Sequence, residues 1–194
     1  KHIGIAGLFG IPVIAVVLAD RKRQVIENFA PTLARIFAPL FTLAIVTFLI
    51  AMAVAGTKPS GAREILLVMN ILLLIVGAML FYDVSARQED EARVVSDWAN
   101  IILVVVALFL DSVALSGISS RLLEQGITPN RAAVFGLNVI LLIHLAILFV
   151  TYLRYMTGRV RFRSIEATVV RMIPVYGVWL VLVVVGFPIL FGGA

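Results

Sequence analysis

The apolar run Trp98–Ile118, WANIILVVVALFLDSVALSGI, contains a single acidic residue, Asp111, and decides which class of fold the chain can adopt. A helix needs about 20 predominantly apolar residues to cross the hydrocarbon core of a bilayer, and this run has that length. It does not alternate apolar and polar residues as a strand of a membrane barrel would. Because backbone polar groups find no water in lipid, the run is predicted to be a transmembrane helix.

Further apolar runs of similar length flank this one on both sides. The predicted fold is therefore all-α, a polytopic transmembrane helix bundle of about six spans. The other predicted spans are His2–Ala19, Ile36–Gly56, Ile65–Ala86, Ala132–Leu153 and Ala167–Phe191. We expect residues 1–194 to form a single transmembrane helical domain, and a fragment of a longer chain because it starts at Lys1 without methionine.

Composition supports a membrane location and limits the partners. Of the 194 residues, 62% are hydrophobic and 14% are charged, too apolar a composition for a soluble domain that must cover itself with polar groups. The lipid bilayer is the expected partner, together with other membrane subunits or a second copy. Nucleic acid is not expected, because the basic residues lie beside apolar runs, where positive charge sets topology. With no cysteine, disulfides, iron–sulfur clusters and thiolate zinc sites are excluded, and no cofactor is expected.

The basic residues also predict an orientation. Cytoplasmic loops of membrane proteins carry an excess of Lys and Arg. One predicted side holds 11 of the 16 basic residues: Arg21, Lys22, Arg23, Arg35, Arg87, Arg93, Arg154, Arg159, Arg161, Arg163 and Arg171. The other side holds Lys1, Lys58, Arg63, Arg121 and Arg131. We expect the first side to be cytoplasmic and the chain to be a multi-pass protein of the bacterial cytoplasmic (inner) membrane. An interfacial helix is expected at Asp20–Arg35 on that side.

The connection RLLEQGITPNR, Arg121–Arg131, has the residues of a tight helical hairpin. Gly126 can adopt the positive φ that ends a helix. Thr128 is a good N-cap, and Pro129 fits the first helical position because its missing N–H is not needed there. Arg131 is expected at the lipid boundary with its guanidinium extended towards the headgroups.

This connection resembles the Y-G-[LI]-T-x-x-R stretch of an uncharacterised bacterial family of polytopic membrane proteins, a domain of unknown function. Flanking features are similar too: the sequence PSG at Pro59–Gly61 and Arg121 before the motif. Gln125 stands where the family usually has Tyr. The resemblance covers about residues 25–155 and implies a fold and a membrane location, but no reaction.

Polar residues inside spans are the default functional candidates, because placing them in lipid is costly. Asp111 is either a proton or cation site, or a structural group bonded to another helix or reaching the nearby interface. Ser112, Ser116, Gly117, Ser119 and Ser120 follow it and indicate close helix packing more than a nucleophile.

Three further residues complete the candidate intramembrane polar site: Asn138, His144 and Arg171. His144 is a candidate ligand or proton carrier, or a hydrogen-bonding link between helices. Asn138, six residues earlier, is predicted to face a different side of the same helix. Arg171 is interpreted as an interfacial anchor or as the partner of Asp111. Asn70 shares a helix face with Gly77, which predicts close packing there.

The sequence lacks the motifs of nucleotide, zinc-protease and dinucleotide sites, so no catalytic, cofactor-binding or metal-binding residue is predicted. We expect a non-enzymatic integral membrane protein, a scaffold or accessory subunit that binds other membrane components. The alternative is a small transporter or channel core that uses Asp111 as a proton or cation site. An intramembrane enzyme is the third hypothesis. Convergence of Asp111, Asn138, His144 and Arg171 on one cavity would favour transport.

Overall fold

The computed structural model describes residues 37–59, 61, 63–86 and 95–191, and all its regular structure there is helical. Its elements are the helix Phe37–Val54, α2 Arg63–Ala86, α3 Val95–Gln125, α4 Pro129–Met156, α5 Arg163–Val181, η1 Leu182–Gly186 and α6 Phe187–Phe191. Five helices in this part of the chain are long and apolar enough to cross a membrane, the last formed by α5, η1 and α6 together. The protein is thus a multi-pass, all-α membrane protein with five described spans. The predicted span His2–Ala19 and the predicted interfacial helix Asp20–Arg35 lie outside the described residues.

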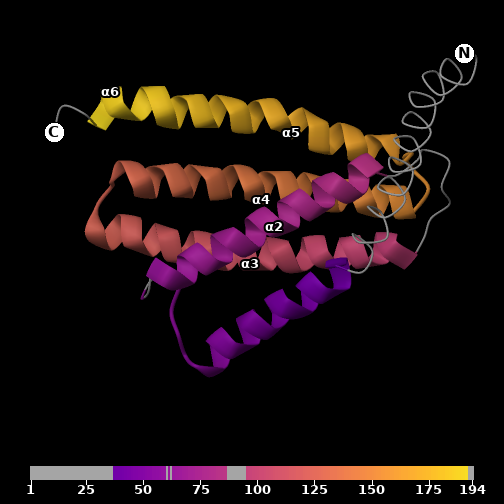
Figure 1. Cartoon of the computed structure of the whole chain (residues 1–194), viewed down its shortest axis with the longest axis horizontal. Helices are drawn as coiled ribbons and strands as arrows, with labels where there is room; N and C mark the ends of the chain where they lie inside the picture. Colours follow the sequence, from indigo (N-terminus) through magenta and orange to yellow (C-terminus); the bar gives the residue numbers. More distant parts are fainter. Residues whose placement is uncertain (1–36, 60, 62, 87–94, 192–194) are drawn as a thin grey trace, which may run out of the picture.

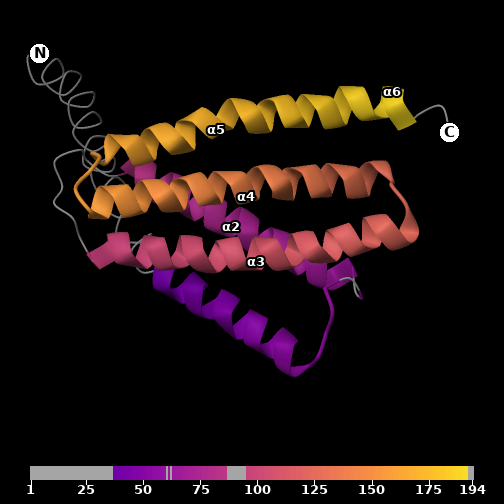
Figure 2. The ribbon, with the colours of Figure 1, turned by 180° about the vertical axis from the view of Figure 1, so that it is seen from behind.

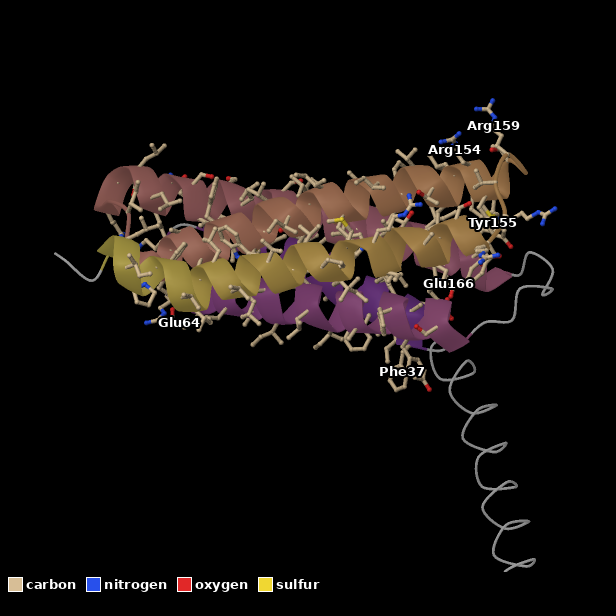
Figure 3. All side chains as sticks on the ribbon, turned by 90° about the horizontal axis from the view of Figure 1, so that it is seen from above. Phe37, Glu64, Arg154, Tyr155, Arg159 and Glu166 are labelled. Carbon is tan, nitrogen blue, oxygen red and sulfur yellow. The ribbon has the colours of Figure 1, made fainter. Side chains whose placement is uncertain are left out.

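The helices form an antiparallel bundle in which α3, α4 and α5 lie side by side (Figure 1). Helix α2 crosses one face of this layer obliquely, and the view from behind shows it on the far side of α3 and α4 (Figure 2). The Phe37–Val54 helix lies beside α3, on the side away from α5. Phe37, Arg154, Arg159 and Glu166 lie at one end of the bundle and Glu64 at the other, as alternating spans require (Figure 3).

Helix α3 is the centre of the bundle, because it packs against both α2 and α4. Its inward face is built from fully buried apolar side chains, among them Val104, Ala107, Leu110 and Ala114. The prediction of close packing holds at Gly117, where a Cβ would lie 2.7 Å from Pro59 Cβ and 3.2 Å from Leu66 Cδ2. Only a residue without a side chain permits this approach.

The predicted hairpin between α3 and α4 is confirmed. Gly126 has a φ of 79°, and the Thr128 side chain accepts a hydrogen bond from the Arg131 backbone N–H at 3.4 Å, with Pro129 at the helix start. The Arg131 guanidinium folds back over the turn and donates to the Gln125 and Gly126 carbonyls, at 2.9 and 3.0 Å, and to Gln125 Oε1 at 2.6 Å. The negative end of the α3 dipole favours this position over an extended one.

The last span contains two prolines, Pro174 and Pro188, and stays continuous through a π-helical turn. Pro188 has no N–H to donate, so the regular bonding pattern is interrupted there. The Phe187 N–H donates instead to the Leu182 carbonyl, five residues earlier, within η1. A single π turn is a common way to keep a helix intact at such a site.

Candidate functional site

Asp111 lies near the middle of helix α3. It follows Val95 by 16 residues (111 − 95) and precedes Gln125 by 14 (125 − 111), so about 20 Å of helix separates it from either end. Its side chain has no exposed surface. Neither carboxylate oxygen has a hydrogen-bond partner among the residues that the structure describes. Burial in the bundle is therefore established, but the helix-to-helix bond expected of a structural Asp111 is not seen.

Asn138 joins α4 to α2. Its Nδ2 donates to Asn70 Oδ1 at 2.9 Å and to the Val134 carbonyl at 2.8 Å. The Asn70 Nδ2 in turn donates to the Leu66 carbonyl at 2.9 Å. The two asparagine side chains thus link α2 to α4. Asn138 Oδ1 is buried and has no partner in the described part of the chain.

His144 joins α4 to α5. Its Nδ1 lies 3.0 Å from the Tyr176 hydroxyl, and the two rings are tilted with centroids 5.8 Å apart. The other ring nitrogen, Nε2, is buried without a partner among the described residues. Tyr176 was not predicted as a site residue. The antiparallel arrangement of α4 and α5 could have identified Tyr176 from the sequence. His144 and Tyr176 each lie 16 residues from Val160 in the turn between these helices (160 − 144 and 176 − 160).

A cavity of about 540 Å³ lies between α2, α4 and α5; we call it the α2/α4/α5 cavity. Its polar lining residues are Asn70, Asn138, His144 and Tyr176. Its apolar lining residues are Leu67, Ile71, Leu73, Leu74, Gly77, Ala78, Leu80, Phe81, Leu137, Leu141, Leu145, Leu148, Val169 and Ile173. None of these described residues is charged. Leu74 and Ile173 are also exposed on the outer surface, at 73% and 49%, so the cavity opens towards lipid.

Asn138 and His144 were expected on different sides of α4, and they bond to different helices, Asn138 to α2 and His144 to α5. Both nevertheless line the α2/α4/α5 cavity. Six residues turn a helix through 600°, which leaves the two side chains about 120° apart, and a cavity among three helices reaches both. Gly77 was expected at a close helix contact, but a Cβ there would meet no described atom within 4 Å. Gly77 widens the cavity instead.

The four predicted site residues do not all converge. Asn138 and His144 share the α2/α4/α5 cavity, whereas Asp111 and Arg171 are not among the described residues that line it. Arg171 is exposed, as an anchor would be. Asp111 is fully buried and lacks a bonded partner among the described side chains, so the ion pair with Arg171 is not formed.

Two other polar contacts hold helices together. Asp83 of α2 accepts a hydrogen bond from Asn100 Nδ2 of α3. On α5, the Trp179 indole occupies the space beside Gly136 of α4, and its Nε1 donates to the Ala133 carbonyl at 3.3 Å. The sequence analysis did not identify this Trp–Gly contact.

Within the described residues, no group of three His, Cys, Asp or Glu side chains is placed to hold a metal ion. The serines after Asp111 bond within their own helix: Ser112, Ser119 and Ser120 donate to the carbonyls four residues before them. Together, the fold and these contacts define a helical integral membrane protein with a lipid-open, largely apolar cavity. No protein-family model, no curated protein and no solved structure matches the chain.

Proposed function

We propose that this chain is a non-enzymatic membrane protein, a scaffold or accessory subunit, and that the α2/α4/α5 cavity binds the apolar chain of another membrane component. The observation that carries the proposal is the cavity itself, about 540 Å³ with an uncharged and mainly aliphatic lining. This volume falls within the usual range of small-molecule pockets, roughly 300–1,000 Å³. It suits a lipid chain and is too small for a packed helix.

The polar residues of the cavity are occupied chiefly with holding helices together. Asn70 binds Asn138, and His144 binds Tyr176, so the walls that remain for a ligand are aliphatic. A lipid chain gains little by moving from lipid into such a cavity, because both surroundings are apolar. Selectivity would then come from shape and from close packing, as in helix association within membranes.

The outer face of α5 supports the role of an accessory subunit. Only 6% of the apolar stretch of the last span is buried inside the chain, so nearly all of that helix is open to lipid or to a partner. The resemblance to an uncharacterised bacterial family is consistent with a protein of the bacterial cytoplasmic membrane. In that setting the end of the bundle with Arg154 and Arg159 would face the cytoplasm.

Photo-crosslinking of lipid tests the cavity. The protein is reconstituted with a phosphatidylcholine that bears a diazirine on one acyl chain, and labelled peptides are identified by mass spectrometry. Gly77→Leu should fill open space in the cavity and reduce labelling of α2 and α4 several-fold. Gly177→Leu is the matched control, because a Cβ at that α5 glycine also meets no described atom within 4 Å, yet Gly177 is not a cavity residue. Equal labelling of the two variants would contradict the proposal.

The alternative function is a small transporter or channel core with Asp111 as its proton or cation site. The observation in its favour is that both Asp111 oxygens are buried and unbonded among the described residues. Vesicles that contain the purified protein and a trapped pH-sensitive dye test this alternative. Transport by Asp111 requires a proton or cation flux in the wild type that Asp111→Asn abolishes; absence of flux in the wild type would remove this alternative.

A further inference from the structure

Three side chains inside the bundle carry buried polar atoms without partners in the described structure: both oxygens of Asp111, Oδ1 of Asn138 and Nε2 of His144. Buried polar atoms in native proteins are almost always bonded, either to the protein or to ordered water. Asp111 and Asn138 are at least nine-tenths buried, with 0% and 1% of their surface exposed. The unbonded atoms of Asp111 on α3 and of His144 on the adjacent helix α4 therefore require an explanation.

Asp111 and His144 lie at the same depth on two helices that pack together. Counting from Ile127 in the turn between α3 and α4, Asp111 is 16 residues before it and Ile143, next to His144, is 16 after it (127 − 111 and 143 − 127). Tyr176 is bonded to His144 from α5. The register of the two hairpins thus places groups from α3, α4 and α5 at one depth.

A protonated Asp111 matches the hydrogen-bonding capacity of either tautomer of His144 and also avoids a buried charge. In one neutral tautomer of His144 the Nε2 atom is a hydrogen-bond donor, and in the other it is an acceptor. A protonated carboxyl group suits both, because it offers an O–H donor and a carbonyl acceptor. An ionised carboxylate can only accept, and it would place a net negative charge in a low-dielectric region. An ion pair with a protonated His144 would carry two desolvated charges.

We propose that Asp111, His144 and Tyr176 form a hydrogen-bonded chain across α3, α4 and α5 that holds one proton on the Asp111 carboxyl group near the membrane centre. Neither Asp111 nor Nε2 has a partner among the described residues, and in the proposed chain an ordered water molecule bridges them. The bound species is a proton and not a metal ion. The chain depends neither on lipid binding in the α2/α4/α5 cavity nor on transport.

Other charged groups do not neutralise this carboxyl within the described residues. From α2, the nearest polar side chain in the cavity wall is the uncharged Asn70. The Phe37–Val54 helix contains no ionisable residue. From α4 and α5, the ionisable groups inside the bundle are His144, Tyr152, Tyr155 and Tyr176, while Arg171 is exposed. Among the described residues, a proton on the carboxyl group is therefore what neutralises the carboxylate.

Infrared difference spectroscopy of the whole chain in nanodiscs tests the protonation and the link. At neutral pH, the wild type should show the carbonyl band of a protonated carboxylic acid, and Asp111→Asn should lose it. His144→Gln should shift this band, and Tyr176→Phe should shift it less. Glu64→Gln, which removes an exposed carboxylate at the start of α2, is the control and should leave the band unchanged. A band that persists in Asp111→Asn, or that stays unshifted in His144→Gln, overturns the proposal.

Nitrogen NMR of histidine-labelled protein provides a second measurement that needs no change in the buried chain. The sequence has two histidines, so His2→Gln assigns the His144 signals directly. A neutral imidazole, with unequal nitrogen shifts, is expected at neutral pH. An imidazole with both nitrogens protonated would mean an ion pair with Asp111 and would contradict a proton held by the carboxyl group.

Discussion

Helices α3 and α5 have nearly the same hydropathy, but they occupy opposite environments. Half of the apolar stretch of α3 is buried inside the bundle, whereas 6% of the stretch that begins with α5 is buried. Helix α3 carries Asp111 on its buried face, and α5 carries Arg171 on an exposed one. A strongly apolar sequence identifies both as membrane spans, but it does not distinguish a helix packed in protein from one that faces lipid.

The difference between the two helices lies in how neighbours approach them. Helix α3 has Gly117 at a contact that admits no side chain, while Gly177 of α5 has open space beside it. Helix α5 is held to α4 by a few specific contacts, chiefly His144 with Tyr176 and the Trp179 indole beside Gly136. Substitutions at contacts of α3 should therefore destabilise the protein much more than substitutions on the open face of α5.

The largest effect is expected for Gly117→Leu in α3. The new side chain would overlap Pro59 and Leu66, so the connection at Pro59 and helix α2 would have to move away from α3. Such overpacking typically costs about 1–3 kcal/mol and sometimes more. Thermal unfolding in detergent, followed by circular dichroism, should show a clearly lower midpoint. Gly177→Leu is the control and should leave the midpoint unchanged; a similar loss in both variants would mean that α5 is packed as tightly as α3.

A smaller, local effect is expected for Gly136→Leu in α4. The Trp179 ring occupies the space that the new side chain would need, so the indole must leave and its bond to the Ala133 carbonyl breaks. A lost neutral hydrogen bond of this kind costs about 1 kcal/mol.

Tryptophan fluorescence can follow the displacement of Trp179. The chain has two tryptophans, and Trp98→Phe leaves Trp179 as the reporter. Brominated lipid should quench the Gly136→Leu variant more strongly than the parent, because a displaced ring enters lipid. Unchanged quenching would show that the contact between Trp179 and Gly136 does not hold α5 against α4.

The sequence was sufficient for the spans because their length and composition follow directly from the thickness of a bilayer. It was also sufficient for the hairpin, since Gly126, Thr128 and Pro129 each have a local conformational preference that fixes the turn. In contrast, the contacts of Gly77, Gly117 and Gly136 depend on which residues of other helices lie opposite. Identical glycines served as a cavity wall in one place and as a close contact in the others.

The sequence predicted the candidate site only in part, because contacts between helices depend on which residues lie opposite. Asp111, Asn138 and His144 were selected because polar groups in lipid are costly, a rule that needs no tertiary structure. The partners of Asn138 and His144 come from α2 and α5, and helix periodicity alone does not give them. Arg171 was selected by the same rule but is exposed, because a long side chain can reach the interface from within a helix.

The smallest effect is expected for the bond between Asn70 and Asn138, which joins α2 to α4 beneath the α2/α4/α5 cavity. Hydrogen bonds between membrane helices contribute on average about 0.6 kcal/mol, because the separated helices also find other partners. We expect a coupling energy of about that size in a double-mutant cycle of Asn70→Leu and Asn138→Leu, measured by unfolding in detergent. The cycle is needed because Asn138 also bonds the Val134 carbonyl, and that bond is lost whether or not Asn70 is present. A coupling of zero would mean that the two amides do not stabilise the contact between α2 and α4, and that apolar packing alone positions α2 against the layer of α3, α4 and α5.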